Sequence, residues 1–416
     1  MTELNEGKRG EIVDRVIKTV EARFYDPKFN GVDMRGRLGS AKPEIIRKSA
    51  AEDFETAVNK ALAELKTSHV GFFHGSKPRV SGRIAISATF TKGQTKEGER
   101  WVFQDVHPSG PAARAGVAPG DILLRLDDQE TTPPDAPNFP LGSVKVLTVL
   151  RADGTTSRIQ VEVPGAKSKK QPVVVPGSVV SAKKLENGIG WIRITMFPGM
   201  VGVEVARDIS AAVRDLGCSR LIFDLRGNTG GGVGCIRLMS QLCTGKQGVG
   251  YSLTRKVLQN GGCDKERLAR FDRIPETRAG LYLRVPALVF RFARAGRAVA
   301  LFTEGLGPQK HHGKAVLLVN EHSASASEMV AAFAAENRFA TLVGTKTPGR
   351  LTGANSFKVG YGYRLVLPVA QYRTWNETVL EGRGVDVDIV EPLSLDELWL
   401  GNDNQLARAA RAASLQ

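Results

Sequence analysis

The segment KAVLLVNEHSASASEMVAAF, residues 314–333, places a short apolar run, a polar loop and an alanine-rich run in succession. A short apolar run followed by a longer helix-favouring run predicts a strand that leads into a helix. Ser323, Ser325 and Ser327 lie at alternate positions between the two. Ser325 and Glu328 fit the S-x-x-E pattern of a capping box, which explains one serine structurally. A serine at a helix N-terminus also lies beside free N–H groups that favour a developing negative charge.

A second loop of this kind follows the apolar run RLIFDL. Residues 224–234 read DLRGNTGGGVG, which is neither a Walker loop nor a GxGxxG fingerprint. Strand and helix signals alternate on both sides of it, and this alternation predicts an α/β domain with mostly parallel strands. Ligands of such sheets lie beyond the carboxyl ends of the strands, where both loops fall. The glycine run could therefore offer bare N–H groups to an oxyanion, although, taken by itself, the run is better explained by a flexible turn.

The pattern of apolar residues is different in the N-terminal half. Residues 11–24 and 54–65 carry apolar side chains four apart, which predicts two helices, the second with a capping box at Ser49 and Glu52. Residues 80–164 contain short alternating runs that predict strands. Within them VHPSGPAARAGVAPGDILLRLDD, residues 106–128, resembles a PDZ domain, with a short helix over PAARAG and a strand at ILLRL. This resemblance implies peptide binding at a sheet edge, and a β-domain that only packs is the alternative.

Composition narrows the classes of function. The 416 residues carry a net charge of +15, but the densest basic stretch, 267–297, has no zinc-finger or RNA-recognition signature, so nucleic acid is not an expected partner. Four cysteines without a CxxC pair indicate neither zinc nor a disulfide framework. No apolar segment is long enough to span a membrane, although residues 285–302 could lie on a membrane surface as an amphipathic helix. The N-terminus lacks a signal-peptide core, so we expect a cytoplasmic location and keep a periplasmic one open.

The DLRGNTGG and SASASE motifs together resemble the C-terminal-processing and tricorn-core family of serine peptidases, over residues 188–392. The resemblance implies a Clp-protease/crotonase-like α/β domain that uses no metal or cofactor and takes peptide or protein substrates. It implies that Ser325 is the nucleophile, whereas Ser323 and Ser327 keep loop and helix-start roles. It also implies an oxyanion hole from the N–H of Ala326 and of Gly230 or Gly231.

The family has two branches that differ in the general base. The processing branch uses a lysine 25 residues beyond the serine, but this chain has Arg350 there, and arginine does not deprotonate at working pH. Lys346 is a weaker substitute. The tricorn-like branch uses a histidine in an LGTSH segment, which matches LKTSH here and implies His69 as the base.

In that branch a serine and a glutamate orient the histidine. Ser68 matches the serine, and Glu381 in LEGRGVDVDI matches the glutamate. The Pro-Asp pair that usually follows is replaced by Val387 and Asp388. Arg350 could bind a substrate carboxylate or be ordinary surface charge.

These inferences predict an α/β peptidase domain with an inserted PDZ-like β-domain and a helical N-terminal segment. The expected division is a helical segment with the Ser-His motif at 1–78, a PDZ-like domain at 79–165, a linker at 166–180, a catalytic domain at 181–398 and a C-terminal tail at 399–416. The expected function is a serine peptidase that cleaves extended or C-terminal peptide segments through an acyl-enzyme on Ser325. A non-catalytic peptide-binding protein is the alternative, and a homo-oligomer stays open.

Overall fold

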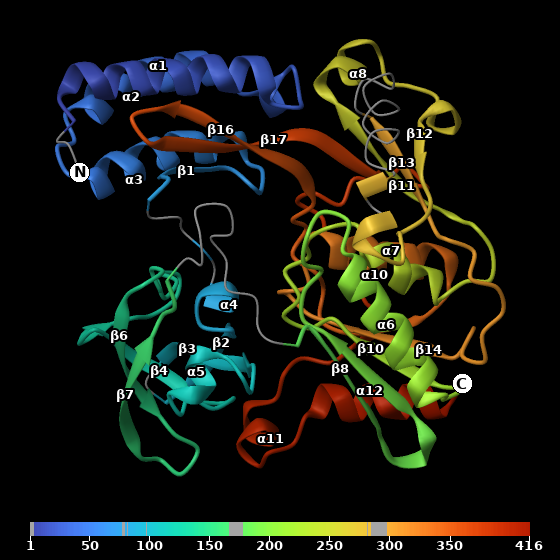
Figure 1. The fold of residues 1–416 in the computed structure, drawn as a ribbon. Coiled ribbons are helices and arrows are strands. Elements are labelled where there is room, and N and C mark those ends of the chain that lie inside the picture. The colour runs from blue at the N-terminus through green and yellow to red at the C-terminus, as the bar shows by residue number, and fades with distance from the viewer. Residues whose placement is uncertain are drawn as a thin grey trace.

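The computed structural model describes residues 4–76, 80, 82–96, 98–165, 178–280, 282–283 and 298–416. In this part of the chain the strands form three six-stranded sheets (Figure 1). The residues that connect the PDZ-like region to the rest, 166–177 of the expected linker, lie outside the described residues. So do residues 281 and 284–297 of the basic stretch, which include most of the expected amphipathic helix.

The central sheet has the strand order β18-β15-β14-β10-β9-β8. All neighbours are parallel except β8 and β9. Its strands are β8 (Val180–Lys184), β9 (Gly190–Ile194), β10 (Leu221–Asp224), β14 (Ala315–Val319), β15 (Thr341–Gly344) and β18 (Ile389–Val390). Every residue of β10 and β14 is buried, as expected for parallel strands that are covered on both faces.

Helices cover both faces of the central sheet. One face packs against the helices α6 (Val203–Leu216), α7 (Cys235–Ser240) and α10 (Ala326–Asn337). The other face packs against α12 (Asn404–Ser414), which lies within the expected C-terminal tail (Figure 1). Alternate side chains divide between the two cores: Leu317 belongs to the first, and Val316 and Leu318 to the second. The α/β fold class predicted from the alternating signals is confirmed.

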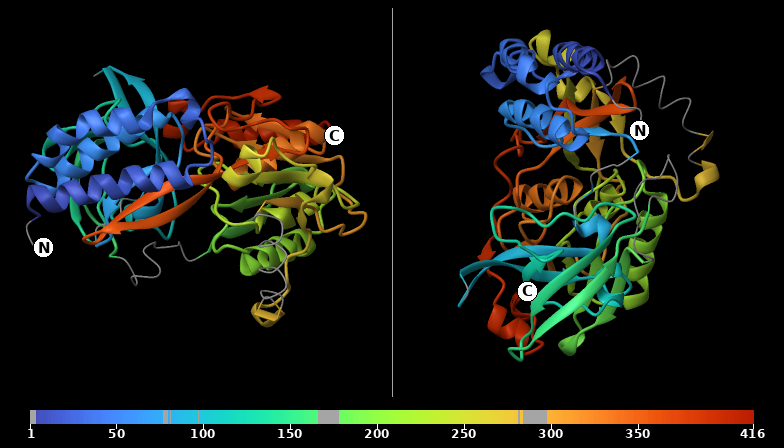
Figure 2. Two further views of the ribbon diagram at one scale, coloured as in Figure 1. Left: turned by 90° about the horizontal axis from the view of Figure 1, so that it is seen from above. Right: turned by 90° about the vertical axis from the view of Figure 1, so that its left-hand side faces the viewer.

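The second sheet, here called the hairpin sheet, has the order β1-β17-β11-β13-β12, with β16 paired to β17. Its strands are β1 (Gly71–His74), β11 (Gly248–Thr254), β12 (Ala269–Phe271), β13 (Val299–Phe302), β16 (Thr352–Gly360) and β17 (Tyr363–Thr374). The helices α1 (Glu6–Arg23), α2 (Met34–Ile46) and α3 (Ala51–Leu62) cover its β1–β17–β16 part (Figures 1 and 2). The N-terminal segment therefore shares one hydrophobic core with residues 352–374.

One local prediction in these helices is wrong. Ser49 and Glu52 do not form a capping box, because α3 begins at Ala51 with Ala50 as its N-cap and has no capping hydrogen bond from a side chain. The helix starts one residue too late for the serine to reach its first N–H groups.

The third sheet has the order β2-β3-β4-β6-β7, with β5 paired to β4 and all pairs antiparallel. Its strands are β2 (Ala88–Thr95), β3 (Gly98–Val106), β4 (Ile122–Leu126), β5 (Gln129–Glu130), β6 (Val144–Leu150) and β7 (Thr156–Glu162). With α4 (Gly82–Ala85) and α5 (Pro111–Arg114) it encloses a core of its own. We call this unit the β-domain. The short helix and the ILLRL strand lie where the sequence predicted them.

The part of the chain that the structure describes also contains these short elements: η1 (Phe29–Gly31), η2 (Ala63–Leu65), η3 (Glu186–Gly188), α8 (Arg255–Gln259), η4 (Lys265–Arg267) and α11 (Leu395–Trp399). Among the described residues, no helix is both long and apolar enough to cross a membrane.

Candidate active site

Ser325 lies at the turn between β14 and α10, where the chain leaves the carboxyl end of a central strand. It is the N-cap of α10 and has φ 57° and ψ −118°, a conformation that a non-glycine residue rarely adopts. Such backbone costs about 1–3 kcal/mol and persists only where the surroundings impose it, most often at functional sites. The residue is half-buried, and the next residue, Ala326, begins the helix.

The other two serines of the loop are fully buried and hold it in place. Ser323 Oγ donates to the carbonyl oxygen of Leu225 at 2.8 Å and accepts the N–H of Asn320 at 2.9 Å. Ser327 Oγ donates to the carbonyl oxygen of Asn228 at 3.0 Å. These bonds connect the serine loop to the glycine loop that follows β10.

Glu328 organises the backbone around Ser325. One carboxylate oxygen accepts the N–H of Ser325 at 3.0 Å and of Arg350 at 2.7 Å, and the other accepts the N–H of Gly349 and the hydroxyl of Thr347. The side chain is fully buried, which raises its pKa, while the four donors oppose that rise. Glu328 is thus more than a helix cap, because it joins the serine turn to residues 347–350.

The glycine loop lies directly against the serine. A Cβ on Gly230 would stand 2.6 Å from the Cβ of Ser325 and 2.8 Å from the backbone nitrogen of Ala326, and its φ is +90°. The N–H of Gly230 donates to Asn228 Oδ1 at 2.8 Å, so this donor is already engaged. Within the described chain we find no acceptor for the N–H of Gly231 or Ala326. A side chain at position 230 would fill the space in front of these two N–H groups, so only glycine leaves it open.

Gly231 is fixed from its other side by the segment after β9. The N–H of Phe197 donates to the carbonyl of Gly230 at 2.9 Å, and the N–H of Gly232 donates to the carbonyl of Phe197 at 2.8 Å. A Cβ on Gly231 would lie 2.0 Å from the same carbonyl oxygen. The loop is therefore a braced structure and not a flexible turn.

Ser68, His69 and Glu381 form a hydrogen-bonded chain. Ser68 Oγ lies 2.7 Å from Nδ1 of His69 and donates to a Glu381 oxygen at 2.9 Å. The other Glu381 oxygen accepts the N–H of Ser68 and, at 3.1 Å, the hydroxyl of Thr67. His69 itself has φ 59°, so the proposed base, like the proposed nucleophile, has strained backbone.

The electrostatics favour a neutral imidazole at His69. The protein atoms packed around the ring lower its pKa from the ordinary 6.5, and the positive charge of Arg350 lowers it further. The negative charge of Glu381 acts in the opposite sense without reversing the shift. A neutral ring with Nδ1 bonded to Ser68 leaves Nε2 for proton transfer.

The two halves of the site meet through adjacent backbone groups. Leu351 donates its N–H to Glu381 at 2.7 Å, while Arg350 donates its N–H to Glu328. The carboxylate that orients His69 and the carboxylate that holds Ser325 are therefore bound by consecutive residues. No pattern in the sequence predicted this connection. The sequence analysis also missed Asn228, which accepts the N–H of Gly230 and stabilises the glycine loop. Its place in the DLRGN motif was the signal that could have found it.

The other candidate bases are engaged elsewhere. Lys346 forms an exposed ion pair with Asp386 at 3.0 Å. The remaining five histidines bond as follows: His74 with Ser76, His107 with Ser109 and the Ser178 carbonyl, His311 with the Gln241 carbonyl, His312 with the Gln309 N–H, and His322 with the Phe90 carbonyl. Among the residues described, no three His, Cys, Asp or Glu side chains come together as a metal site requires.

Comparison with known proteins identifies the family. Residues 188–391 match the sequence model of peptidase family S41. This chain belongs to peptidase family S41.

Relatives and solved structures agree with that assignment. Carboxyl-terminal-processing peptidase 2 of Arabidopsis thaliana is 24% identical over 397 residues, 91% of this chain and 68% of the relative. A carboxy-terminal-processing protease of Bartonella bacilliformis is 26% identical over 305 residues, 72% of this chain and 60% of the relative. The solved photosystem II D1 C-terminal processing protease matches with a TM-score of 0.55 and 16% identity, over 94% of this chain and 96% of that one. The structural match supports the fold alone.

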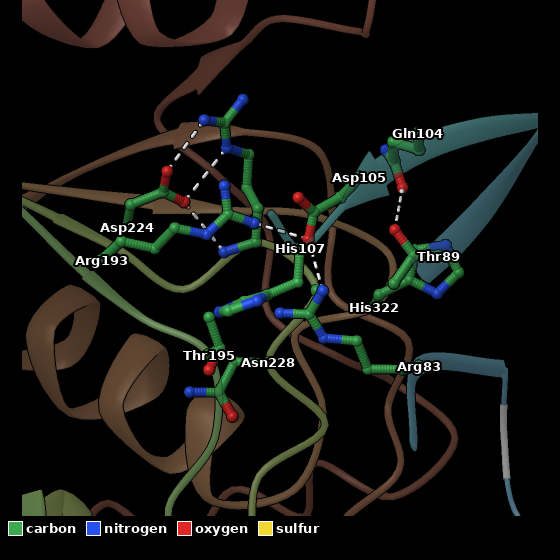
Figure 3. Close-up of polar contacts among 12 residues, drawn as sticks. Arg83, Thr89, Gln104, Asp105, His107, Arg193, Thr195, Asp224, Asn228 and His322 are labelled. Carbon is green, nitrogen blue, oxygen red and sulfur yellow. Dashed lines mark hydrogen bonds and ion pairs between the residues drawn. The ribbon is translucent and has the colours of Figure 1, made fainter. Parts of the chain in front are cut away.

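In this S41 peptidase the β-domain contacts both loops of the site. Figure 3 shows Asp105 of this domain between Arg83 and Arg193. Asp105 of β3 binds Arg83 of α4 at 2.6 Å and Arg193 of β9 at 2.5 Å. A Cβ on Gly227, which begins the glycine loop, would lie 3.1 Å from Asp105 Oδ2. On the serine loop, His322 Nε2 lies 2.6 Å from the carbonyl oxygen of Phe90 on the edge strand β2.

The C-terminal segment stabilises the contact between the β-domain and the glycine loop from the face of the central sheet that α12 covers. Arg226 pairs with Asp224 at 2.8 Å and with Asp403, just before α12, at 2.7 Å. Trp399 donates its indole N–H to the carbonyl of Gly120 in the β-domain at 2.8 Å. These contacts hold the β-domain, the glycine loop and the chain's last helices together.

Proposed function

We propose that this S41 peptidase hydrolyses extended or C-terminal peptide segments through an acyl-enzyme on Ser325, with His69 as the general base. The observation that carries the proposal is the pair of tethers at Arg350 and Leu351, which binds the His69 group and the Ser325 group to consecutive N–H donors. The family match and the processing-protease relatives support the reaction class.

The chemistry follows from these positions. Neutral His69 takes the proton of Ser325 as its Oγ attacks the scissile carbonyl carbon, and the carbonyl oxygen becomes an oxyanion. The N–H groups of Ala326 and Gly231 receive that oxyanion, because Gly230 already donates to Asn228. The imidazolium then returns the proton to the leaving amine as the peptide bond breaks.

A water molecule, deprotonated by His69, next attacks the acyl carbon and releases Ser325. Glu381 acts through Ser68 in both halves of the cycle: it fixes the tautomer of His69 and stabilises the imidazolium form.

A fluorophosphonate probe tests the proposal directly. Wild type should label at Ser325, as mapped by mass spectrometry, and Ser325→Ala should not label. His69→Ala should label at least about 10³-fold more slowly. Ser40→Ala, an exposed serine on α2, is the matched control and should label like wild type. Circular dichroism and thermal unfolding should show that the inactive variants are folded; a folded wild type that does not label contradicts the proposal.

A second role is favoured by an open cavity of about 620 Å³ in the β-domain. It lies beside the edge strand β7 and is lined by Pro111 and Arg114 of α5 and by Gln160 and Glu162 of β7. An edge strand beside a groove suits peptide binding by strand addition, so the β-domain is proposed as a peptide-binding module. If peptides bind Ser325→Ala and His69→Ala as tightly as wild type and no peptide library is cleaved, binding alone is the function.

A further inference from the structure

The loop of residues 65–69, here called the base loop, carries the proposed base His69 and is held by two side chains from other segments. Glu381 accepts three hydrogen bonds from the middle of the loop. At the start of the loop, Asn30 Nδ2 donates to the carbonyl oxygen of Leu65 at 2.7 Å, across 35 residues of sequence. The role of Glu381 belongs to the proposed catalytic chain, whereas Asn30 has no part in it.

The start of the base loop needs a donor from outside. The helix η2 ends at Leu65, and the chain leaves it through Lys66, whose backbone is left-handed with φ 48° and ψ 46°. Carbonyl groups in the last turn of a helix have no partner within that helix. The Leu65 side chain is fully buried in the core that the N-terminal helices share with the hairpin sheet. The bond from Asn30 therefore fixes the carbonyl from which the chain turns toward His69.

Asn30 lies in the turn between α1 and α2, and several contacts fix this turn. Asn30 has φ 55° and the preceding Phe29 has φ 52°, so two successive residues other than glycine have left-handed backbone. The carboxylate of Asp26 accepts the N–H of Asn30 at 2.6 Å. Arg255 of α8 donates to the carbonyl of Phe24 at 2.9 Å, and its guanidinium lies over the Phe29 ring. Strained backbone of this kind persists only where its surroundings impose it.

The amide of Asn30 has one favourable orientation. Its Nδ2 faces the Leu65 carbonyl, and its Oδ1 accepts a long hydrogen bond of 3.4 Å from the hydroxyl of Tyr25. The reverse orientation would place two oxygen atoms against each other at Leu65. Burial raises the pKa of the Tyr25 phenol, and the negative charges of Asp26 and Glu381 raise it further. The phenol is therefore close to both side chains that hold the base loop.

Turn geometry alone does not account for this asparagine. Glycine adopts left-handed backbone more easily than any other residue, and an asparagine in a turn commonly bonds to its own neighbouring backbone. Here the amide bonds instead to the carbonyl at which the base loop begins. A general base must stay within hydrogen-bond reach of the proton it takes, and a misplacement of about 1 Å can cost about 10²-fold in rate.

We propose that Asn30 is a positioning residue for the proposed base: through the Leu65 carbonyl it holds the base loop so that Nε2 of His69 stays within reach of Ser325. The inference rests on the proposed peptidase function. Asn30 touches neither the substrate nor the reacting atoms and acts only through the base loop. The N-terminal helices thereby contribute to the reaction, because the turn between two of them anchors the base.

Substitutions at position 30 separate the amide from the backbone conformation. Asn30→Gly keeps the left-handed turn and removes only the amide. Its kcat for a fluorogenic peptide and its rate of fluorophosphonate labelling should fall by about 10–100-fold, with KM within about twofold of wild type. Asn30→Asp has nearly the same shape but sets a carboxylate oxygen against the Leu65 carbonyl, so its kcat should fall at least as far. Tyr25→Phe removes only the hydroxyl that orients the amide and should lower kcat by about two- to tenfold.

A pH profile distinguishes positioning from a general loss of stability. Burial is the main cause that lowers the pKa of His69, while Glu381 acts against it and Arg350 acts in the same sense. A loosened base loop lets water reach the ring, so its pKa should rise toward the ordinary 6.5. The acid limb of the kcat/KM profile of Asn30→Gly should therefore move to higher pH.

Asn5→Ala is the matched control. Asn5 is the N-cap at the opposite end of α1, where its side chain accepts the N–H of Lys8 at 2.9 Å. Its replacement removes one asparagine hydrogen bond from the same helical unit without touching the base loop. It should lower the midpoint of urea denaturation but keep the wild-type kcat, labelling rate and acid limb.

The outcomes separate this inference from the peptidase proposal. If wild type labels and the folded Asn30 variants keep kcat and labelling within about twofold of it, only this inference fails. A raised KM at unchanged kcat, or an equal loss of kcat in Asn5→Ala, overturns it as well, because neither is the effect of a displaced base. Should both Asn30 variants fail to fold, Tyr25→Phe decides, and unchanged kcat and acid limb there refute the inference. A folded wild type that neither labels nor cleaves removes the peptidase proposal itself.

Discussion

Replacing Glu381 by glutamine is the sharpest test of the hydrogen-bonded chain behind His69. The two carboxylate oxygens accept four donors: the N–H and hydroxyl of Ser68, the hydroxyl of Thr67 and the N–H of Leu351. A glutamine is nearly the same size, but one oxygen becomes an NH2 group. Either orientation of the amide places this NH2 against a backbone N–H, of Ser68 in one case and of Leu351 in the other.

The structure sets the magnitude of the effect. A donor left without a partner costs about 1–3 kcal/mol, so the free energy of unfolding of Glu381→Gln should fall by about 2–4 kcal/mol. Loss of the acid that directly contacts the base costs about 10⁴-fold in a serine-histidine-aspartate triad. Because Glu381 acts through Ser68, we expect kcat to fall by about 10²–10³-fold.

Three measurements on one preparation check this prediction. Urea denaturation gives stability, fluorophosphonate labelling gives the reactivity of Ser325, and peptide turnover gives kcat and KM. Glu64→Gln is the matched control, because Glu64 is exposed on η2 and close in sequence to the same loop. The reasoning is refuted if folded Glu381→Gln labels and turns over within about twofold of wild type.

Three further changes probe other parts of the site. Gly230→Ala adds a Cβ 2.6 Å from that of Ser325 at a φ of +90°, so kcat should fall by about 10²–10³-fold; unchanged kcat would place the oxyanion elsewhere. Arg350→Gln removes a charge that lowers the pKa of His69, so the acid limb of the kcat/KM profile should move to higher pH, while Arg350→Lys leaves it in place. Asp105→Asn breaks two ion pairs and should cost about 3–5 kcal/mol in urea denaturation, less as the pH falls toward the lowered pKa of this aspartate; an equal cost at all pH values would count against the pairing.

Local patterns predicted the central sheet well, because its strands alternate along the chain with helices and both kinds of element have a recognisable apolar pattern. The fully apolar β14 and the alanine-rich α10 are adjacent in sequence, and their order alone implies a strand that leads into a helix. The hairpin sheet lacked such a signal. Its strand β1 pairs with β17, with Gly71 opposite Val366, and no local pattern encodes a partner almost three hundred residues away.

The candidate site, like the fold, could be predicted from the sequence only in part. Local patterns placed the serine loop and the glycine loop at the ends of strands. The roles of Ser325, His69, Ser68 and Glu381 were inferred from a family resemblance. The bonds of Glu328 were not predicted, because three of its four donors lie on a loop about twenty residues downstream. The S-x-x-E pattern accounted only for the hydrogen bond between Glu328 and Ser325 and gave no indication of the bonds to residues 347–350.

The tethers also explain how arginine can occupy a position where the processing branch has its catalytic lysine. Residue 350 contributes to the framework through its backbone N–H, which any residue except proline supplies. The preceding Gly349 cannot vary as freely, because a Cβ there would lie 2.7 Å from the nitrogens of Arg383 and Gly384, and its φ is +70°. Under the proposed assignment of His69 as the base, the side chain at 350 takes no part in proton transfer and can hold a permanent charge. That charge adds to the burial that lowers the pKa of His69, so the residue at the lysine position acts on the proposed base through its charge and not through proton transfer.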